Sequence, residues 1–222
     1  ARLMNSTPQT EEQAMVRKVA VSSFLGNFIE WFDYASYSYF ATTIALVFFP
    51  TDNHTVAMLQ TFGVFALSFI LRPIGALFWG SYGDKKGRKA ALAHSIMFMS
   101  GASFLIGCLP SYSVIGVGAP ILLLLLRMVQ GFSASGEYAG AATFLGEYAP
   151  TSKRGIYCSL IPASTAIGLL AGSTLATLMT ANMNSSAMVG WGWRVPFLLA
   201  GPLGLIVLYI RAKLADSPST SR

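Results

Sequence analysis

Residues 80–89 read Gly80-Ser81-Tyr82-Gly83-Asp84-Lys85-Lys86-Gly87-Arg88-Lys89, and they separate two apolar stretches that are each long enough to cross a lipid bilayer. Three glycines, four cations and one acid in ten residues predict a tight polar loop between two membrane helices. Lys and Arg beside short membrane loops stay in the cytoplasm, so this segment sets the orientation of the whole chain.

The composition places the chain in the membrane. Hydrophobic residues make up 54% of it, charged residues 11%, and the mean hydropathy is +0.56. About a quarter of the residues of a soluble domain are charged, so these values indicate an all-α integral membrane protein. A span needs ~20 apolar residues to cross ~30 Å of hydrocarbon. Six predicted spans meet or approach that length: 19–49, 59–82, 90–109, 120–144, 156–179 and 195–210.

The cations are distributed unevenly between the predicted loops. Twelve of the 15 Lys and Arg residues fall in the N-terminal segment, the second and fourth loops and the C-terminal segment, and none falls in the three remaining loops. This asymmetry predicts that both ends of the chain are cytoplasmic. The expected location is the plasma membrane, of the bacterial inner-membrane kind. The net charge of +6 follows from the same asymmetry, so we expect the lipid bilayer and no nucleic acid as a partner.

Five ionisable residues fall inside the predicted spans: Glu30, Asp33, Arg72, Arg127 and Glu137. Charges at membrane depth are costly, and they face a bundle interior or a wet cavity. Two interpretations are open, a purely structural buried pair or a substrate and proton route, and the second is the more usual in membrane proteins.

Helical geometry predicts which of these groups meet. A rise of 1.5 Å per residue puts Glu30, Asp33, Arg72 and Glu137 at ~12, ~16, ~15 and ~12 Å above the cytoplasmic face, and Arg127 at ~27 Å. The first four therefore form a feasible cluster. Two polar stripes at helical spacing are expected to line an aqueous path. They comprise Asn27, Glu30, Tyr34 and Tyr37 on the first span, and Arg127, Gln130, Ala134 and Glu137 on the fourth.

Three acids against two guanidiniums leave one carboxylate without a full partner. A desolvated acid of this kind is suited to take up and release a proton. Asp33 and Glu30 are the favoured carriers over Glu137, with little to separate them. The alternative is a carboxyl group that is simply protonated, or one that is hydrogen-bonded by Tyr34, Tyr37 or Asn27.

Other chemistry finds little support. Cys108 and Cys158 lack neighbouring thiols or histidines, so we expect no metal and no cofactor. Ser133-Ala134-Ser135-Gly136 comes near the nucleophile motif of intramembrane serine proteases, but no histidine lies on the sixth span to act as a base. The chain is therefore not expected to be an enzyme.

Several motifs resemble one transporter family. Gly80-x3-Asp84-x2-Gly87-Arg88-Lys89 and Arg127-x2-Gln130-Gly131 resemble the second-loop and fourth-helix motifs of the major facilitator superfamily. Finer matches are similar to its metabolite:proton symporters, which include proline/betaine, 2-oxoglutarate, citrate and shikimate permeases. They are Gly26–Asp33, Leu71–Gly75, Gln130–Ser133, Gly136–Tyr138, Glu147–Pro150 with Lys153–Gly155, and Gly192–Phe197.

This resemblance implies secondary active symport of a small polar organic solute, an organic acid, amino acid or betaine, with protons by alternating access. It implies proton coupling through Arg127 together with Glu30, Asp33 and Glu137. The substrate path would contain Asn27, Tyr34, Tyr37, Arg72 and Gln130. The cytoplasmic gate would comprise Gly80, Asp84, Gly87, Arg88, Glu147 and Arg154.

The family has twelve helices in two halves, each built from inverted three-helix repeats. We therefore expect an N-terminal six-helix half, cut short in its sequence, whose partner is the missing C-terminal half. The expected boundaries are 1–18 for a cytoplasmic segment, 19–212 for the bundle and 213–222 for the start of a central cytoplasmic loop. The alternative is a non-catalytic half-transporter or channel-like subunit that acts as a homodimer.

Overall fold

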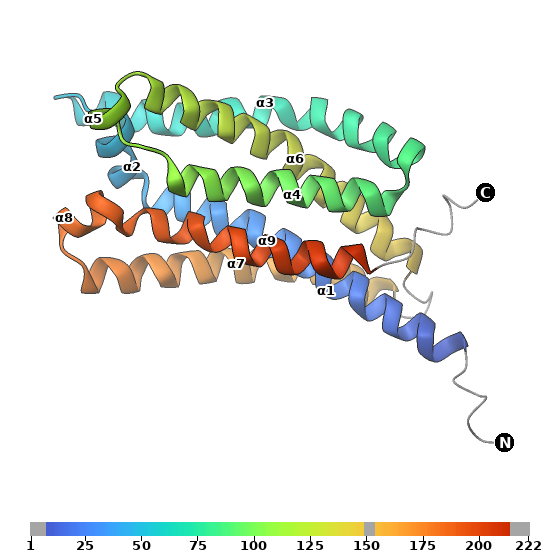
Figure 1. The fold of residues 1–222 in the computed structure, drawn as a ribbon. Coiled ribbons are helices and arrows are strands. Elements are labelled where there is room, and N and C mark those ends of the chain that lie inside the picture. The colour runs from blue at the N-terminus through green and yellow to red at the C-terminus, as the bar shows by residue number, and fades with distance from the viewer. Residues whose placement is uncertain (1–7, 149–153, 214–222) are drawn as a thin grey trace.

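The computed structural model describes residues 8–148 and 154–213, and both ranges are mostly helical (Figure 1). Six long helices run side by side: α1 Pro8–Tyr39, α3 His54–Lys86, α4 Arg88–Cys108, α6 Gly118–Tyr148, α7 Arg154–Asn182 and α9 Arg194–Ala212. Short elements join them at one end: α2 Ala41–Phe48, α5 Tyr112–Ile115, α8 Ser185–Ala187 and the π-helical turn η1 Met188–Gly192.

The first predicted span is two helices rather than one. The chain turns at Phe40, between α1 and α2, and α1 itself begins at Pro8, well before the expected start. Five spans within the described residues are long and apolar enough to cross a membrane: His54–Lys86, Lys89–Cys108, Gly118–Gly136, Ser159–Asn182 and Ser185–Ala212. The helix α1 is not among them, and it carries buried Asn27, Glu30 and Asp33.

The glycine-rich segment is not the open loop that its composition predicted. The helix α3 continues through Gly80 and Gly83 to Lys86, and α4 begins at Arg88. Gly87 alone reverses the chain, with φ of 94°, a conformation open to glycine at little cost. Its N–H donates to the Gly83 carbonyl and so caps α3. The helix continues beyond the apolar stretch because each further residue adds a backbone hydrogen bond, and the unfavourable helix propensity of two glycines does not outweigh this gain.

The cationic segments lie at one end of the bundle. The start of α1, the α3–α4 turn and the end of α9 share that end, whereas α2, α5 and α8 lie at the other (Figure 1). Arg17, Lys18, Lys85 and Lys86 are exposed there. The predicted separation of cation-rich and cation-free connections is therefore present in the fold.

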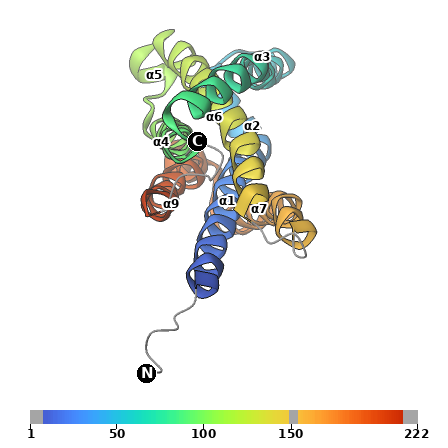
Figure 2. The ribbon, with the colours of Figure 1, turned by 90° about the vertical axis from the view of Figure 1, so that its right-hand side faces the viewer.

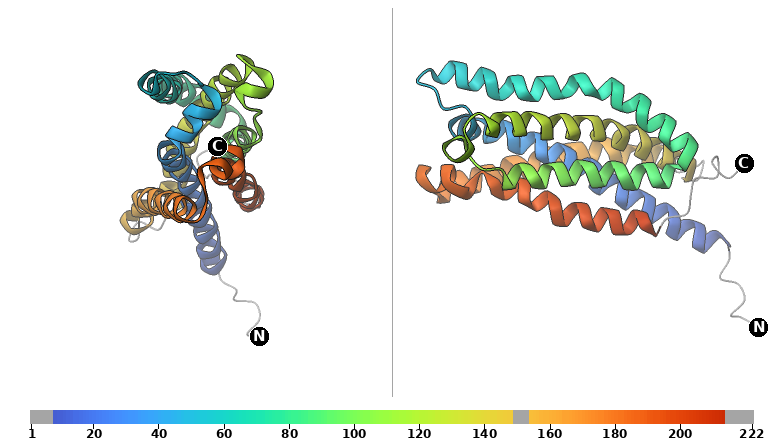
Figure 3. Two further views of the ribbon diagram at one scale, coloured as in Figure 1. Left: turned by 90° about the vertical axis from the view of Figure 1, so that its left-hand side faces the viewer. Right: turned by 45° about the horizontal axis from the view of Figure 1, so that its top comes forward.

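The helices pack in a pattern that repeats. The helix α1 packs against α7 and α9, and α6 packs in the same way against α3 and α4, while α4 pairs with α9 and α1 contacts α6. Seen along the bundle, α3 and α7 lie at the margins of one side and α4 and α9 lie together on the other (Figures 2 and 3). The helices α1, α3 and α4 correspond in this order to α6, α7 and α9. Replacing each helix by its counterpart gives the same packing pairs, as expected of two inverted three-helix repeats.

Small residues let the helices of these pairs approach closely. A Cβ atom on Gly131 would overlap the Ser68 carbonyl, and one on Gly75 would overlap the Phe132 carbonyl and the Ser135 hydroxyl. The helices α3 and α6 therefore touch backbone to backbone, which is how membrane helices associate without a hydrophobic driving force. The Ser135 hydroxyl fits because it donates back to Phe132 within its own helix.

Two large polar side chains near the two ends of α9 are buried. Trp193 is fully buried against Phe48 and Phe197. Arg211, one of the cations counted in the predicted C-terminal segment, is also fully buried and donates to the carbonyl oxygens of Leu92 and Ser22, each at 3.1 Å. It joins the end of α9 to α4 and α1, a tertiary role that a local charge count does not detect.

We predict that Gly131→Ala destabilises the bundle by about 1–3 kcal/mol, because the added methyl group meets a backbone oxygen that no side-chain rotation can move. The measurement is thermal unfolding of the full-length protein in detergent. Gly63→Ala on α3 is the matched control, since its Cβ would meet nothing within 4 Å. Equal melting temperatures for the two variants would contradict the close α3–α6 contact.

Candidate functional site

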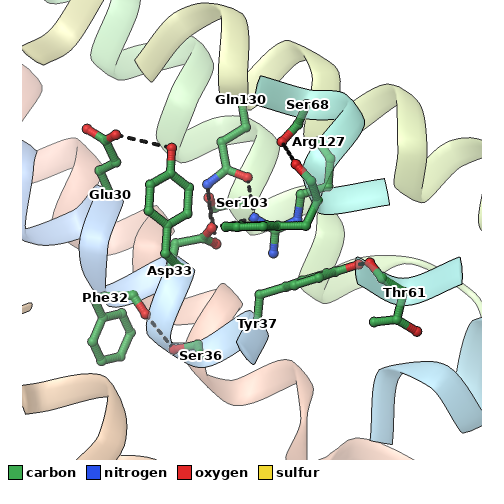
Figure 4. Close-up of polar contacts among 12 residues, drawn as sticks. Glu30, Phe32, Asp33, Ser36, Tyr37, Thr61, Ser68, Ser103, Arg127 and Gln130 are labelled. Carbon is green, nitrogen blue, oxygen red and sulfur yellow. Dashed lines mark hydrogen bonds and ion pairs between the residues drawn. The ribbon is translucent and has the colours of Figure 1, made fainter. Parts of the chain in front are cut away.

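A buried ion pair lies where α1, α4 and α6 meet. Arg127 Nη1 lies 2.5 Å from Asp33 Oδ2, and both side chains are at most 2% exposed. Gln130 Nε2 donates to the same oxygen at 2.6 Å, and Ser103 Oγ donates to Asp33 Oδ1 at 3.2 Å. Figure 4 shows these groups converging from three helices. The carboxylate thus accepts three hydrogen bonds, which offset part of its desolvation cost.

Aromatic rings surround the Arg127 guanidinium. Its Cζ lies 4.1 Å from the ring centroid of Tyr37 and 5.4 Å from that of Phe197, within the range of cation–π attraction. Its Nη1 also donates to Gln130 Oε1 at 2.7 Å. Its Nε and Nη2 are buried and have no hydrogen-bond partner among the described residues. Asp33 is therefore the charge partner of the guanidinium, whose Nε and Nη2 groups can still donate hydrogen bonds.

The height predicted for Arg127 was wrong. It was placed about a third of a membrane above Asp33, but the two residues are in contact. Heights were counted from assumed helix ends along straight, upright helices. The helix α1 starts at Pro8, before the predicted span that begins at 19, and α6 runs on to Tyr148, beyond the predicted end at 144. The assumed helix ends were therefore displaced.

A second ion pair joins α1 to α3. Arg72 Nη2 lies 2.5 Å from Glu30 Oε1, and Tyr34 donates to the same oxygen at 3.1 Å. The Arg72 guanidinium packs on the rings of Tyr34 and Phe69. Unlike Arg127, Arg72 keeps a quarter of its side chain exposed. The pair borders a hollow of about 350 Å³ between α1, α3 and α7, lined also by Trp31, Pro162 and Thr165.

The other residues of the predicted path have structural contacts. Asn27 Nδ2 lies within 2.9 Å of three acceptors on α7, namely the Ile161 carbonyl and the hydroxyls of Ser164 and Thr165. Tyr37 donates to the Thr61 carbonyl on α3 at 2.6 Å. Both side chains are buried, so they tie α1 to its neighbours as well as lining its polar face. Their assignment to a substrate path stays a prediction.

The predicted gate is described only in part. Gly80 is open to its surroundings, Asp84 is exposed on the last turn of α3, and Gly87 forms the turn. The side chains of Arg88, Glu147 and Arg154, and that of Glu137, lie outside what the structure describes. The expected contribution of Glu137 to the acid cluster therefore remains a prediction.

Sequence reasoning missed Ser103 and the aromatic surroundings of Arg127. Ser103 lies in an apolar stretch of α4 and is fully buried, yet it contacts both Asp33 and Gln130. A lone serine in a membrane helix usually bonds its own backbone, so nothing local distinguishes it. Across residues 8–148 and 154–213, no three His, Cys, Asp or Glu side chains gather closely enough to hold a metal ion.

Comparison with known proteins places this arrangement in a family. The family model described as "Sugar (and other) transporter" matches residues 18–219. A glycine betaine/proline/ectoine/pipecolic acid transporter of Dickeya dadantii, OusA, is 43% identical over 208 residues, and a proline/betaine transporter of Escherichia coli is 41% identical over the same length. Each alignment covers 94% of this chain but 42% of the relative, so the chain spans less than half of their length.

Solved structures with the same fold are much less similar in sequence. A D-xylose–proton symporter superposes with a TM-score of 0.81 at 18% identity, over 92% of this chain and 49% of that one. An inward-open xylose transporter XylE from Escherichia coli gives 0.79 at 17% identity, over 92% and 49%. At such identities the likeness shows the fold alone, which is about half of a major facilitator transporter. The chain belongs to the family described as "Sugar (and other) transporter".

Proposed function

We propose that the protein containing this chain is a proton-coupled symporter of a small polar organic solute, working by alternating access with a second six-helix half. The buried Asp33–Arg127 pair carries the proposal, because a charge network at membrane depth is expensive and usually serves transport. The relatives named above, which are proline and betaine transporters, support the solute class. The metabolite:proton symporters, the subgroup predicted from the motifs, have this activity.

Asp33 is the proposed proton carrier. As a carboxylate it joins α1 to α6 through Arg127 and Gln130, and to α4 through Ser103. A proton on Asp33 removes the negative charge and leaves the Arg127 guanidinium buried without a counter-ion, which costs several kcal/mol. The bundle then favours a conformation in which Arg127 finds water or another acceptor. Protonation and conformation are thereby linked, as coupling between a proton and a solute requires.

The hollow at Glu30 and Arg72 is the proposed solute subsite of this half. Proline and glycine betaine each carry one carboxylate and one positive nitrogen. Arg72 has spare guanidinium donors for a carboxylate, and Trp31 and Glu30 present a ring and a negative charge to a cation in the same hollow. The opposite wall would come from the second half.

The orientation follows from the charges. We place the end that carries Lys85, Lys86 and the α3–α4 turn in the cytoplasm of a bacterial cell, with both ends of the chain on that side. At this end Asp84, Arg88, Glu147 and Arg154 would form the gate that contacts the second half. Protons, the solute, the bilayer and that half are the proposed partners.

We predict that Asp33→Asn abolishes proton-driven accumulation, because the amide cannot carry a proton but keeps the shape of the side chain. The measurement is uptake of labelled proline or glycine betaine by the full-length protein in liposomes under an imposed pH gradient. Solute exchange at equal pH on both sides checks that the variant still binds and reorients. Accumulation at the wild-type level would contradict the assignment of Asp33.

We predict that Arg72→Lys raises the KM for solute about 10-fold or more, because a charged hydrogen bond contributes roughly 1.5–3 kcal/mol and lysine cannot offer paired donors. Uptake kinetics over a range of solute concentrations give KM and maximal rate separately. Arg17→Lys is the control, since it makes the same replacement at an exposed cation of α1 that does not line the hollow. A fall in maximal rate with KM unchanged would mean that the pair is structural.

A further inference from the structure

A second cavity, which the proposed transport cycle does not use, lies on the other side of α3. It encloses about 710 Å³ between α3 and α4, with α6 as its floor. Most of its wall is apolar, including Leu71, Phe78, Met97, Phe98, Met128 and Phe132. We call it the α3–α4 groove.

The groove and the solute hollow face different surroundings. Leu71 lines the groove, and its neighbour Arg72 lines the hollow, because successive residues of a helix point about 100° apart. The hollow is bordered by an ion pair, whereas the groove has polar lining only at Tyr82, His94 and Ser133. A groove with so few polar groups in a membrane protein is filled by apolar matter rather than by water.

The groove has the depth of one lipid leaflet. Along α3 it extends from Leu71 to Tyr82, and eleven residues at 1.5 Å each span ~16 Å. Half of a ~30 Å hydrocarbon layer is ~15 Å. An extended acyl chain would therefore lie along the groove from the membrane surface to its midplane.

Two of the three polar groups lie at the end of the groove nearest the α3–α4 turn. Tyr82 and His94 lie there in contact, with 2.7 Å between the hydroxyl and Nδ1. Lys85 and Lys86 follow Tyr82 by three and four residues, so they continue the same face of α3, and both are exposed. Two cations, a hydroxyl and an imidazole thus stand at the height where lipid phosphates lie.

We propose that the α3–α4 groove binds an anionic glycerophospholipid, with one acyl chain along Leu71–Tyr82 and the phosphate held by Lys85, Lys86, Tyr82 and His94. Charge complementarity favours this occupant, since anionic lipid attracts basic residues beside membrane helices. A second copy of the chain fits less well. A two-fold contact through this face would bring the same lysines of both copies together at one end of the bundle.

The test is native mass spectrometry of the full-length protein in detergent, titrated separately with phosphatidylglycerol and with phosphatidylcholine of identical acyl chains. We expect tighter binding of phosphatidylglycerol. The double variant Lys85→Gln/Lys86→Gln should bind it about 10-fold more weakly, with phosphatidylcholine unaffected. The variant Arg17→Gln/Lys18→Gln is the matched control, because it removes two exposed cations at the same end from α1, which does not line the groove.

A second pair of variants tests the groove itself. Val129→Trp fills the groove from α6 and should reduce retention of both lipids, whereas Leu170→Trp, on an exposed apolar position of α7 outside the groove, should not. The proposal is overturned if the two lipids bind equally. It is also overturned if Lys85→Gln/Lys86→Gln and Val129→Trp both bind phosphatidylglycerol as tightly as the wild type. A third contradicting result is a wild-type dimer without bound lipid that becomes monomeric in Val129→Trp, because the groove would then be an interface between copies.

Discussion

The fold depends on the contact between Asp33 and Arg127. Removing either partner would leave a buried charge uncompensated, at a cost of about 3–5 kcal/mol. Gln130, Ser103 and the ring of Tyr37 share in holding the pair, and they come from α6, α4 and α1. Those three helices must therefore approach closely, and close glycine contacts join each of them to a further helix, α1 to α7, α4 to α9 and α6 to α3. The proposed proton carrier is therefore also one of the side chains on which the packing of the bundle depends.

Spacing along α1 divides the polar groups between two environments. Glu30 and Asp33 are three residues apart, yet Glu30 pairs with Arg72 beside the solute hollow and Asp33 pairs with Arg127 in the centre of the bundle. In the proposed mechanism, one helix thus carries both the acid beside the solute and the acid that takes the proton. A movement of α1 would change both environments together, which is a physical basis for coupling one to the other.

Much of this could be predicted from the sequence. Apolar length predicted six spans, and six long helices run side by side, although the first predicted span is two helices, α1 and α2. Polar residues at helical spacing singled out α1 and α6, the two helices that hold the Asp33–Arg127 pair. It was harder to predict which side chains contact each other, because these contacts depend on the tilt of each helix and on where it begins. Arg127 was misplaced for that reason, and Ser103 and Arg211 were missed because their partners lie between 27 and 189 residues away in the chain. Gly87 was hidden among two other glycines that the helix simply continues through.

In the proposed mechanism, Asp33 exchanges a proton when solute binds. This exchange can be measured as the pH change on adding proline or glycine betaine to the full-length protein in weakly buffered detergent solution. We expect proton uptake or release with the wild type and with Asp52→Asn, an exposed acid outside the network, and none with Asp33→Asn. Proton exchange of the same size in Asp33→Asn would contradict it.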